Sequence, residues 1–206
     1  KKTGRPKLMS PEKLAEKLFL VFADKGYAST TITDLTQATG MKPASLYLAF
    51  GNKEGMYAAA LAYYRKHWLA ELSQCFQSQQ LSFVERVHEF LLAAFTLFNS
   101  AGKPLGCIMT FSALAFHTEE EGLAAQLRDE RQAFTRWLEK EAIEAQRMGE
   151  LPGRMSPQAY ACFILTMEKG LALNALERPK KEVIKEMIDA VVTTLFASTN
   201  QSQKDP

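Results

Sequence analysis

Hydrophobic residues recur at helical spacing along almost the whole chain. Leu14, Leu18, Val21 and Phe22, for example, follow an i, i+4, i+7, i+8 pattern, which is typical of a helix with one buried face. No Asn-Gly or Asp-Gly hairpin signal and no long run of β-branched residues interrupts the pattern. The sequence therefore predicts an all-α fold.

Glycine, proline and capping residues divide this pattern into about nine helices. Ser10 and Pro11 are typical of a helix start, and Gly26 predicts the end of the first helix. Thr33 is expected to cap the second helix, which ends at Gly40. The helices after the first are expected at residues 33–38, 43–50, 53 to about 77, 82–98, 107–117, 122–148, 156–177 and 179–196.

Charge is distributed unevenly along these helices. Residues 1–67 carry 11 Lys and Arg against 5 Asp and Glu, whereas the remaining residues carry 14 against 18. A basic first third on an acidic remainder indicates that the first third meets a polyanion, unless the clustering is accidental.

Residues 33–50 have the pattern of two short helices joined by a tight turn. Gly40 permits the left-handed backbone of that turn, and Leu35, Leu46 and Phe50 can share a core with the first helix. The second helix can then project into a DNA major groove. Off its apolar stripe lie small, polar or aromatic side chains, although Tyr47 can also simply pack and the nearby threonines simply cap.

The same segment resembles the N-terminal domain of the TetR family of bacterial transcription regulators. The resemblance covers about residues 11–60 and is carried by Thr31, Thr33, Leu35, Gly40-Met41 and the run from Ser45 to Glu54 (SLYLAFGNKE). It implies a dimer with a three-helix DNA-binding domain in residues 1–52, a ligand-binding and dimerising domain in residues 53–198 and a polar tail in residues 199–206. The DNA contacts it implies are Thr31, Thr33, Lys42, Pro43, Ala44, Ser45, Tyr47, Leu48 and Lys53.

Two features set this segment apart from many relatives. Leu48 and Ala49 stand where many TetR proteins have His or an aromatic residue, so a phosphate contact is expected to be lost there, and Leu48 can touch a thymine methyl instead. Residues 1–9 form a basic arm before the first helix, and Arg5 in this arm is expected to increase DNA affinity by counterion release.

The ligand site is expected in the helical body, as a largely apolar pocket for a small apolar or aromatic compound. The candidate lining residues are Phe95, Cys107, Phe111, Leu114, Trp137 and Met167, each of which can equally be ordinary core. Cys107 follows a glycine at a predicted helix start, where the helix dipole can lower the pKa of a thiol. The segment from Leu105 to Ile108 resembles a TetR subgroup that includes the N-ethylmaleimide-responsive repressor, which implies an electrophile-sensing cysteine; a small packed residue is the alternative.

The last two predicted helices carry wide apolar stripes that predict a homodimer interface, unless their own chain covers them. The expected interface residues are Tyr160, Phe163, Ile164, Leu171, Ile184, Ile188, Val191, Val192 and Leu195. A two-fold dimer in turn predicts a palindromic operator on double-stranded DNA.

The sequence gives little support for other functional classes. The three histidines are scattered and no metal-protease or phosphate-loop motif occurs, so no enzyme, metal or cofactor is expected. Three cysteines at unrelated spacings and no apolar run of membrane length favour a bacterial cytoplasmic protein at the nucleoid. The prediction is a DNA-binding repressor released by a small molecule or electrophile; a helical protein-interaction adaptor is the alternative.

Overall fold

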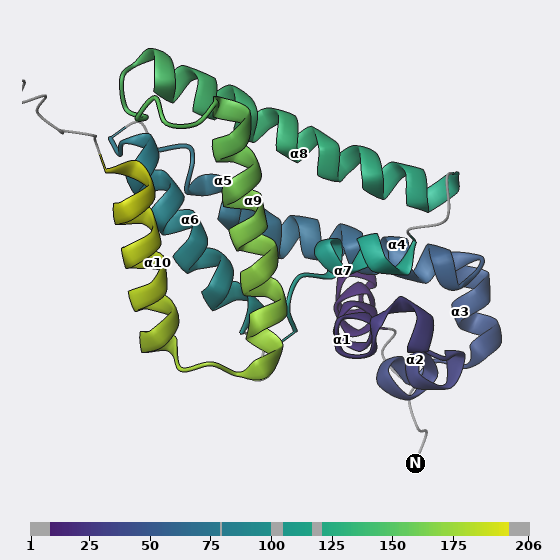
Figure 1. The fold of residues 1–206 in the computed structure, drawn as a ribbon. Helices are drawn as coiled ribbons and strands as arrows, with labels where there is room; N and C mark the ends of the chain where they lie inside the picture. The colour runs from purple at the N-terminus through teal and green to yellow at the C-terminus, as the bar shows by residue number, and fades with distance from the viewer. Residues whose placement is uncertain (1–8, 79, 100–104, 117–120, 198–206) are drawn as a thin grey trace, which may run out of the picture.

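The computed structural model describes residues 9–78, 80–99, 105–116 and 121–197, and within these ranges it contains helices and no strand (Figure 1). The predicted all-α fold is confirmed. In chain order the helices are α1 (Pro11–Ser29), α2 (Ile32–Thr39), α3 (Pro43–Phe50), α4 (Lys53–Tyr64), α5 (Ala70–Gln74), α6 (Phe83–Phe98), α7 (Ile108–Ala115), α8 (Gly122–Arg147), α9 (Pro157–Asn174) and α10 (Lys181–Phe196).

Helices α1 to α3 form a small head around the start of α4. Helix α1 packs along α4 and against α2, and Leu18, Leu35 and Leu46 meet in a fully buried core. Gly26 has a positive φ of 75°, so α1 kinks there, but the helix resumes and continues to Ser29 instead of ending as predicted.

The turn between α2 and α3 follows the expected chemistry with one correction. Thr31, not Thr33, caps α2, because its side chain accepts from the Asp34 amide while the Asp34 carboxylate accepts from the Thr31 amide. Gly40 ends α2 in the left-handed conformation, with φ 71° and ψ 9°. Pro43 begins α3, as the sequence predicted.

The helix expected from residue 53 to about 77 is interrupted. Between α4 and α5 the backbone forms a π-helical turn, Arg65–Leu69, and regular helix resumes at Ala70. Such turns insert one extra residue and change the faces that the two flanking segments present. Arg65 donates two hydrogen bonds of 2.8 Å to the Glu130 carboxylate of α8, so the turn is tied to the body.

Helices α6, α8, α9 and α10 form the body (Figure 1). Helix α9 lies against both α6 and α8, and α10 packs on α6. A 3-10 turn (Ala175–Glu177) follows α9. Phe83 and Tyr160 are fully buried. The Phe83 ring contacts the Phe196 ring edge-on and the Tyr160 ring stacks on it, and these contacts hold together the ends of α6, α9 and α10.

Helix α7 lies at the junction of head and body, where it packs against α1, α4 and α8. The Tyr57 hydroxyl of α4 donates to the Ile108 carbonyl at 3.4 Å. At the other end of α7, the Phe116 ring lies 4.6 Å from the Tyr27 ring of α1, measured between centroids. Glu54 of α4 accepts a 3.0 Å hydrogen bond from the Leu123 amide, in the first turn of α8.

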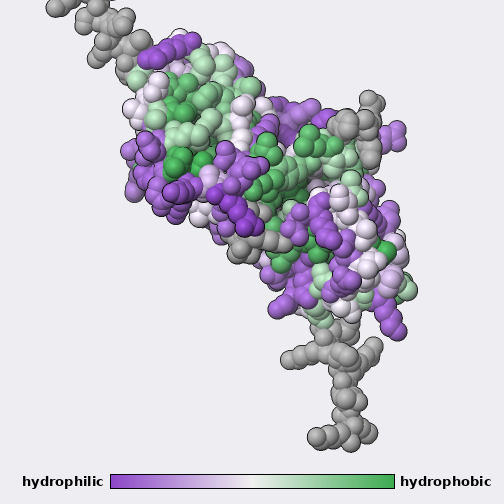
Figure 2. All heavy atoms as spheres, turned by 60° about the horizontal axis from the view of Figure 1, so that its bottom comes forward, coloured by the Kyte–Doolittle hydropathy of each residue, from purple (hydrophilic) through white to green (hydrophobic). Residues whose placement is uncertain are grey.

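Apolar side chains are also exposed on parts of the surface. Figure 2 shows them gathered on the body and between body and head, whereas the head near the N-terminus is mostly polar. No helix in the described ranges is long and apolar enough to cross a membrane.

Candidate DNA-binding surface and interior cavity

Helix α3 presents one continuous exposed face at the far side of the head. Only Leu46 of this helix is fully buried, where it anchors α3 to the core. Leu48 is 91% exposed and Tyr47 is 45% exposed, so both side chains are accessible to another molecule. The expected contact residues on this exposed face are Lys42, Pro43, Ala44, Ser45, Tyr47 and Leu48.

The N-terminus of α3 is open. Lys42 is its N-cap and no side chain bonds to the first turn, while Pro43 supplies the first helical position without an amide hydrogen. Helix α3 contains no acidic residue. An uncapped helix start beside a lysine, with small Ala44 and Ser45 next in line, is suited to close approach by a phosphate.

The remaining expected DNA contacts are placed less uniformly. Thr33 is exposed, and Thr31 is exposed but its hydroxyl already donates to Asp34 in the cap of α2. Lys53 lies with its Nζ 4.6 Å from the centre of the Tyr27 ring and donates to the Ala28 carbonyl, so its ammonium group faces α1. Arg5 lies outside the described residues.

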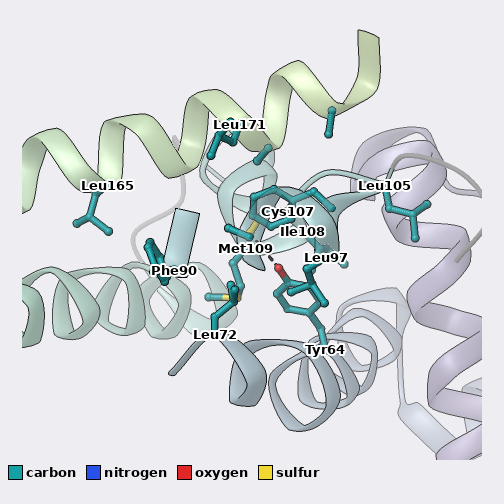
Figure 3. Close-up of a cluster of buried hydrophobic side chains, with 14 of the residues drawn as sticks. Tyr64, Leu72, Phe90, Leu97, Leu105, Cys107, Ile108, Met109, Leu165 and Leu171 are labelled. Carbon is teal, nitrogen blue, oxygen red and sulfur yellow. Dashed lines mark hydrogen bonds between the residues drawn. The ribbon is translucent and has the colours of Figure 1, made fainter. Parts of the chain in front are cut away.

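A cavity of about 270 Å³, partly open to solvent at Ser73 and Lys169, lies between the segment Leu69–Ser73 and helices α6 to α9. Most of its surface is apolar, and Leu72, Phe90 and Met109 form part of the wall (Figure 3). The full lining is Leu69, Leu72, Ser73, Phe90, Cys107, Met109, Thr110, Glu130, Arg131, Phe134, Thr135, Leu165, Glu168 and Lys169.

Cys107 reaches the cavity from the start of α7. It is the N-cap of that helix, and the preceding Gly106 lies so close to α9 that an added Cβ would be 2.7 Å from the Ala172 carbonyl oxygen. This close approach, which only glycine permits, brings the thiol beneath α9. The Tyr64 hydroxyl of α4 donates to the Cys107 sulfur at 3.2 Å (Figure 3).

Burial dominates the protonation of the groups around this thiol. Burial, together with the nearby Glu168 carboxylate, raises the pKa of Cys107 to about 11. The expected lowering of this pKa by the helix dipole is therefore wrong, because desolvation outweighs it. Burial also raises the pKa of Glu168 to about 7, although Lys169 and a hydrogen bond with Cys107 act in the opposite direction.

Two other charged groups at the cavity, Glu130 and Arg131, already have partners. Glu130 accepts both hydrogen bonds from Arg65, and Arg131 donates to the Ser112 hydroxyl at 2.8 Å. Glu168 is only 8% exposed. Among the described residues, it is the one nearly buried carboxyl that lines the cavity without a salt bridge.

Comparisons with known proteins agree with this architecture. The family model of bacterial regulatory proteins of the TetR family matches residues 19–60, from α1 to α4. The transcriptional repressor ComR of Escherichia coli K12 is 26% identical over 187 residues, which cover 91% of this chain and 89% of ComR. A cysteine mutant of the TetR family regulator CifR, solved with 26-base-pair operator DNA, superposes with a TM-score of 0.79 at 27% identity over 93% of this chain and all of CifR.

The head thus matches the TetR family model, and the chain is similar to TetR family regulators over about nine-tenths of its length. The match to ComR and CifR extends beyond the head into the body, so the family resemblance seen in residues 11–60 covers nearly the whole chain. The repressor BdcR of Escherichia coli K12 is 34% identical, but only over 61 residues, or 30% of this chain.

In the body, the lining of this cavity differs from the expected ligand residues. Of the six, only Cys107 lines the cavity. Leu114 is 75% exposed, and Phe95 lines a separate surface hollow together with Lys181. The other three lie in side-chain packing outside the lining: Phe111 against Gly106, Trp137 against Phe76 and Phe134, and Met167 beside the main core.

The cavity residue with the clearest unused sequence signal is Glu168. On α9 the buried positions are Ile164, Leu165, Leu171 and Ala172, and Glu168 occupies the same stripe. An acid within an apolar stripe is costly to bury and therefore indicates a specific role. The aromatic wall residues carry no comparable signal, because their spacing is that of ordinary core.

The expected dimer residues differ in how far they reach the surface of the single chain. Most of them are covered by their own chain: Tyr160, Ile164, Leu171, Ile184, Ile188 and Val192 are buried. Phe163, Val191 and Leu195 are half-buried. The apolar residues that α9, α10 and the turn between them leave exposed are instead Leu173, Leu176 and Val183.

Proposed function

We propose that the protein is a homodimeric transcriptional repressor that binds a palindromic operator and is released when a small molecule or electrophile reacts or binds at the Cys107 cavity. The observation that carries the DNA-binding part is the exposed, acid-free face of α3 with an open N-terminus. Its place of action is the bacterial cytoplasm, at the nucleoid.

The DNA-binding part is supported from two directions. A helix that uses one residue, Leu46, as its buried anchor leaves the rest of its surface for another molecule. CifR, which has a similar fold, was solved in complex with operator DNA, and ComR is a transcriptional repressor. Contacts from Lys42, Ser45, Tyr47 and Leu48 would position α3 in the major groove.

The dimer would form through the outer faces of α9 and α10. Both helices pack on α6 with one face and leave Leu173 and Val183 exposed on another. Gly170 has open space around its Cα, which lets a second helix approach closely. Two heads held by such an interface can read two successive major grooves.

The link from cavity to head would be α7. Cys107 begins this helix at the cavity, and Phe116 ends it against Tyr27 of α1. Because Tyr57 of α4 bonds to the same helix, a shift of α7 would move α1 and α4 together. An effector that favours one position of α7 would then change operator affinity, and operator binding would change effector affinity by the same factor.

Selection of bound sequences from random double-stranded DNA tests the DNA-binding part. The expected result is an inverted repeat, with an affinity that falls steeply with salt because phosphate contacts release counterions. Lack of any salt-dependent DNA binding would contradict the proposal and favour the protein-interaction adaptor.

A matched pair of variants tests the interface. Leu173→Glu places a charge on the proposed face of α9 and is expected to yield monomers in sedimentation analysis. Ile143→Glu, on an exposed position of α8, makes the same kind of change elsewhere and is expected to leave the dimer intact. Equal behaviour of the two variants would place the interface elsewhere.

A further inference from the structure

Glu168 lies on the part of α9 that forms one wall of the cavity. Leu165 and Glu168 both line the cavity, and because they are three residues apart they are neighbours on one face of the helix. Glu168 is 8% exposed, which makes it the most buried of the four charged side chains in the lining; the others are Glu130, Arg131 and Lys169. The charge that is best shielded from solvent in this cavity is therefore that of an acid.

The other three charged side chains have less to offer a molecule in the cavity. Glu130 accepts two hydrogen bonds of 2.8 Å from Arg65. Arg131 donates to a serine hydroxyl of α7 at 2.8 Å, and Lys169 is exposed, where water and salt screen its charge. Glu168, in contrast, forms a salt bridge with none of the described residues. Its carboxyl group is the charge that a bound molecule can pair with.

Aromatic rings form another part of the cavity wall. Phe90 of α6 and Phe134 of α8 both line it, and their ring centroids lie 6.2 Å apart with 42° between the ring planes. Phe134 also stacks on Trp137, with centroids 5.4 Å apart, which fixes the position of its ring. Aromatic rings pack against apolar groups and attract cations placed over their faces. The wall is therefore suited to a molecule with an apolar body and a positive charge.

A carboxyl group in this position is costly when the cavity holds no cation. Burial raises the pKa of Glu168 to about 7, because its ionised form loses hydration. A leucine or a glutamine would fill the position at lower cost. An ammonium group that pairs with the carboxylate compensates for the lost hydration, whereas an anion would be repelled. The carboxyl group thus favours a cation over a neutral or anionic molecule of the same shape.

We propose that the cavity binds small amphipathic amines, with the ammonium group paired to Glu168 and the apolar body packed against Phe90 and Phe134. The inference deepens the proposed function, on which it rests for the role of the cavity, by naming the chemical class of the effector.

The size of the cavity limits the size of this amine. Its volume of about 270 Å³ is close to the lower end of the usual range for ligand pockets, which is about 300–1,000 Å³. The apolar body is therefore expected to be no larger than a single aromatic ring with a short chain. Binding of such an amine is a reversible equilibrium, and it requires no reaction at Cys107.

The groups that face Glu168 are compatible with a bound cation. The Tyr64 hydroxyl of α4 and the Cys107 thiol before α7 are near enough for its charge to act on them, and burial raises the pKa of the thiol to about 11 and that of the hydroxyl well above its usual value. Both groups therefore stay neutral near pH 7. The charged lining residues of α8 are bonded to Arg65 and to a serine hydroxyl, and on α9 itself Lys169 lowers the pKa of Glu168. Among the described residues, α5 and α6 contribute no charged side chain to the lining.

The first test compares three probes of nearly the same shape in the full-length protein. Phenethylamine is a cation near neutral pH, phenethyl alcohol is neutral and hydrocinnamate is an anion. We expect isothermal titration calorimetry at pH 8 to give an affinity for the amine about 10–100-fold above that for the alcohol, the usual effect of a hydrogen bond between charged groups, with the anion weakest. Equal affinities for the amine and the alcohol, or tightest binding of the anion, would overturn the proposal.

Two variants with the same chemical change locate the charge that selects the amine. Glu168→Gln keeps the size of the side chain and removes its charge, so the affinity for phenethylamine should fall by about 10–100-fold while that for phenethyl alcohol stays nearly unchanged. Glu71→Gln makes the same change at an exposed position of α5 and is expected to leave both affinities as they are. Unchanged selectivity in Glu168→Gln would show that the carboxyl group does not contact the amine and would overturn the proposal.

A pH series of the unmodified protein gives a second test that needs no variant. Because the pKa of Glu168 is about 7, its ionised fraction rises about tenfold from about pH 6 to about pH 8. The affinity for phenethylamine should rise by the same factor and then level off, with release of protons on binding near pH 7. Calorimetry in two buffers of different ionisation enthalpy detects this release. An amine affinity that does not change over this range would refute the pairing with Glu168.

Operator binding separates this inference from the proposed function. If phenethylamine binds through Glu168 but a saturating amount leaves operator affinity unchanged, the amine site stands and its role in release fails. If phenethylamine does not bind while N-ethylmaleimide still releases the operator, the repressor proposal stands and the amine site fails.

Discussion

The candidate functional residues of the head lie on the protein surface, whereas those of the body lie in its interior. In the head, Leu46 is buried and Tyr47 and Leu48 are left exposed on the same helix. In the body, Cys107 and Glu168 are themselves buried, among residues that look like ordinary core. The candidate contact residues of the head share the exposed face of one helix, whereas the candidate cavity residue Glu168 is a polar group inside an apolar stripe.

The largest expected effect tests the head alone. Ala44→Asp places a carboxylate in the first turn of α3, where it would meet DNA phosphates but also suits the helix dipole. We expect the melting temperature to stay the same or rise. The free energy of operator binding should weaken by about 2–6 kcal/mol, because one contact is lost in each half of a dimer. Fluorescence anisotropy with a labelled operator measures the loss.

The control for this change is the same charge at a distant site. Ala133→Asp lies on an exposed position of α8 and is expected to leave operator affinity within about 0.5 kcal/mol of the wild type. Ala44→Asp with normal affinity would show that α3 does not face the DNA.

The second prediction separates packing from contact within one helix. Leu46→Ala removes a fully buried side chain, so the free energy of unfolding of the head should fall by about 2–5 kcal/mol. Leu48→Ala removes a side chain that is 91% exposed, so stability should change by less than about 0.5 kcal/mol. Urea unfolding followed by circular dichroism measures both values.

Leu48 is expected to contribute to operator affinity, although it contributes little to stability. If its side chain touches a thymine methyl, Leu48→Ala should weaken binding to operators with that thymine and leave non-specific binding unchanged. Equal losses of stability for the two leucine variants would mean that α3 packs differently from the structure.

These two regions also differ in how far the sequence predicted them. The caps and turns of the head are local, so Ser10, Gly40 and Pro43 were sufficient to predict most helix boundaries there. The mistaken cap at Thr33 arose because Thr31 has the same chemistry and is followed at the right distance by Asp34.

The cavity required information that local patterns do not contain. Its wall combines α5 to α9, and which face of each helix points inwards depends on their packing. The π-helical turn at Arg65–Leu69 shifts the register of one wall without any proline or glycine to announce it. The apolar stripes of α9 and α10 face α6 and α8 within the chain, so they do not indicate which apolar residues, such as Leu173 and Val183, stay exposed.

The third prediction uses a titration in the body. Because burial raises the pKa of Glu168 from 4.5 to about 7, the folded state binds its proton more tightly than the unfolded state. Its contribution is therefore lost as the pH rises from about 4.5 to 7, by on the order of 1–3 kcal/mol. Glu168→Gln should remove this dependence and unfold at higher urea than the wild type at pH 8.

The expected difference is specific to high pH. At pH 4, where Glu168 is protonated, Glu168→Gln and the wild type should have similar midpoints of unfolding. A wild-type advantage at pH 8 would show that the carboxylate is stabilised by a contact other than those around Cys107.

The smallest expected effect comes from the head, and it has the opposite sign. Hydrogen bonds from Lys25 and Thr31 lower the pKa of Asp34 from 3.8 to about 2, so its contribution is present above pH 4 and is lost as the pH falls towards 2. Asp34 is half-buried at the surface of the head, and salt weakens its pairing with the exposed Lys25. Asp34→Asn should slightly lower the melting temperature at pH 6, with the gap closing near pH 2. An unchanged melting temperature in Asp34→Asn would show that the cap at Thr31 does not depend on the charge of Asp34. The pH dependence that Glu168 gives to the body should be the same in this variant.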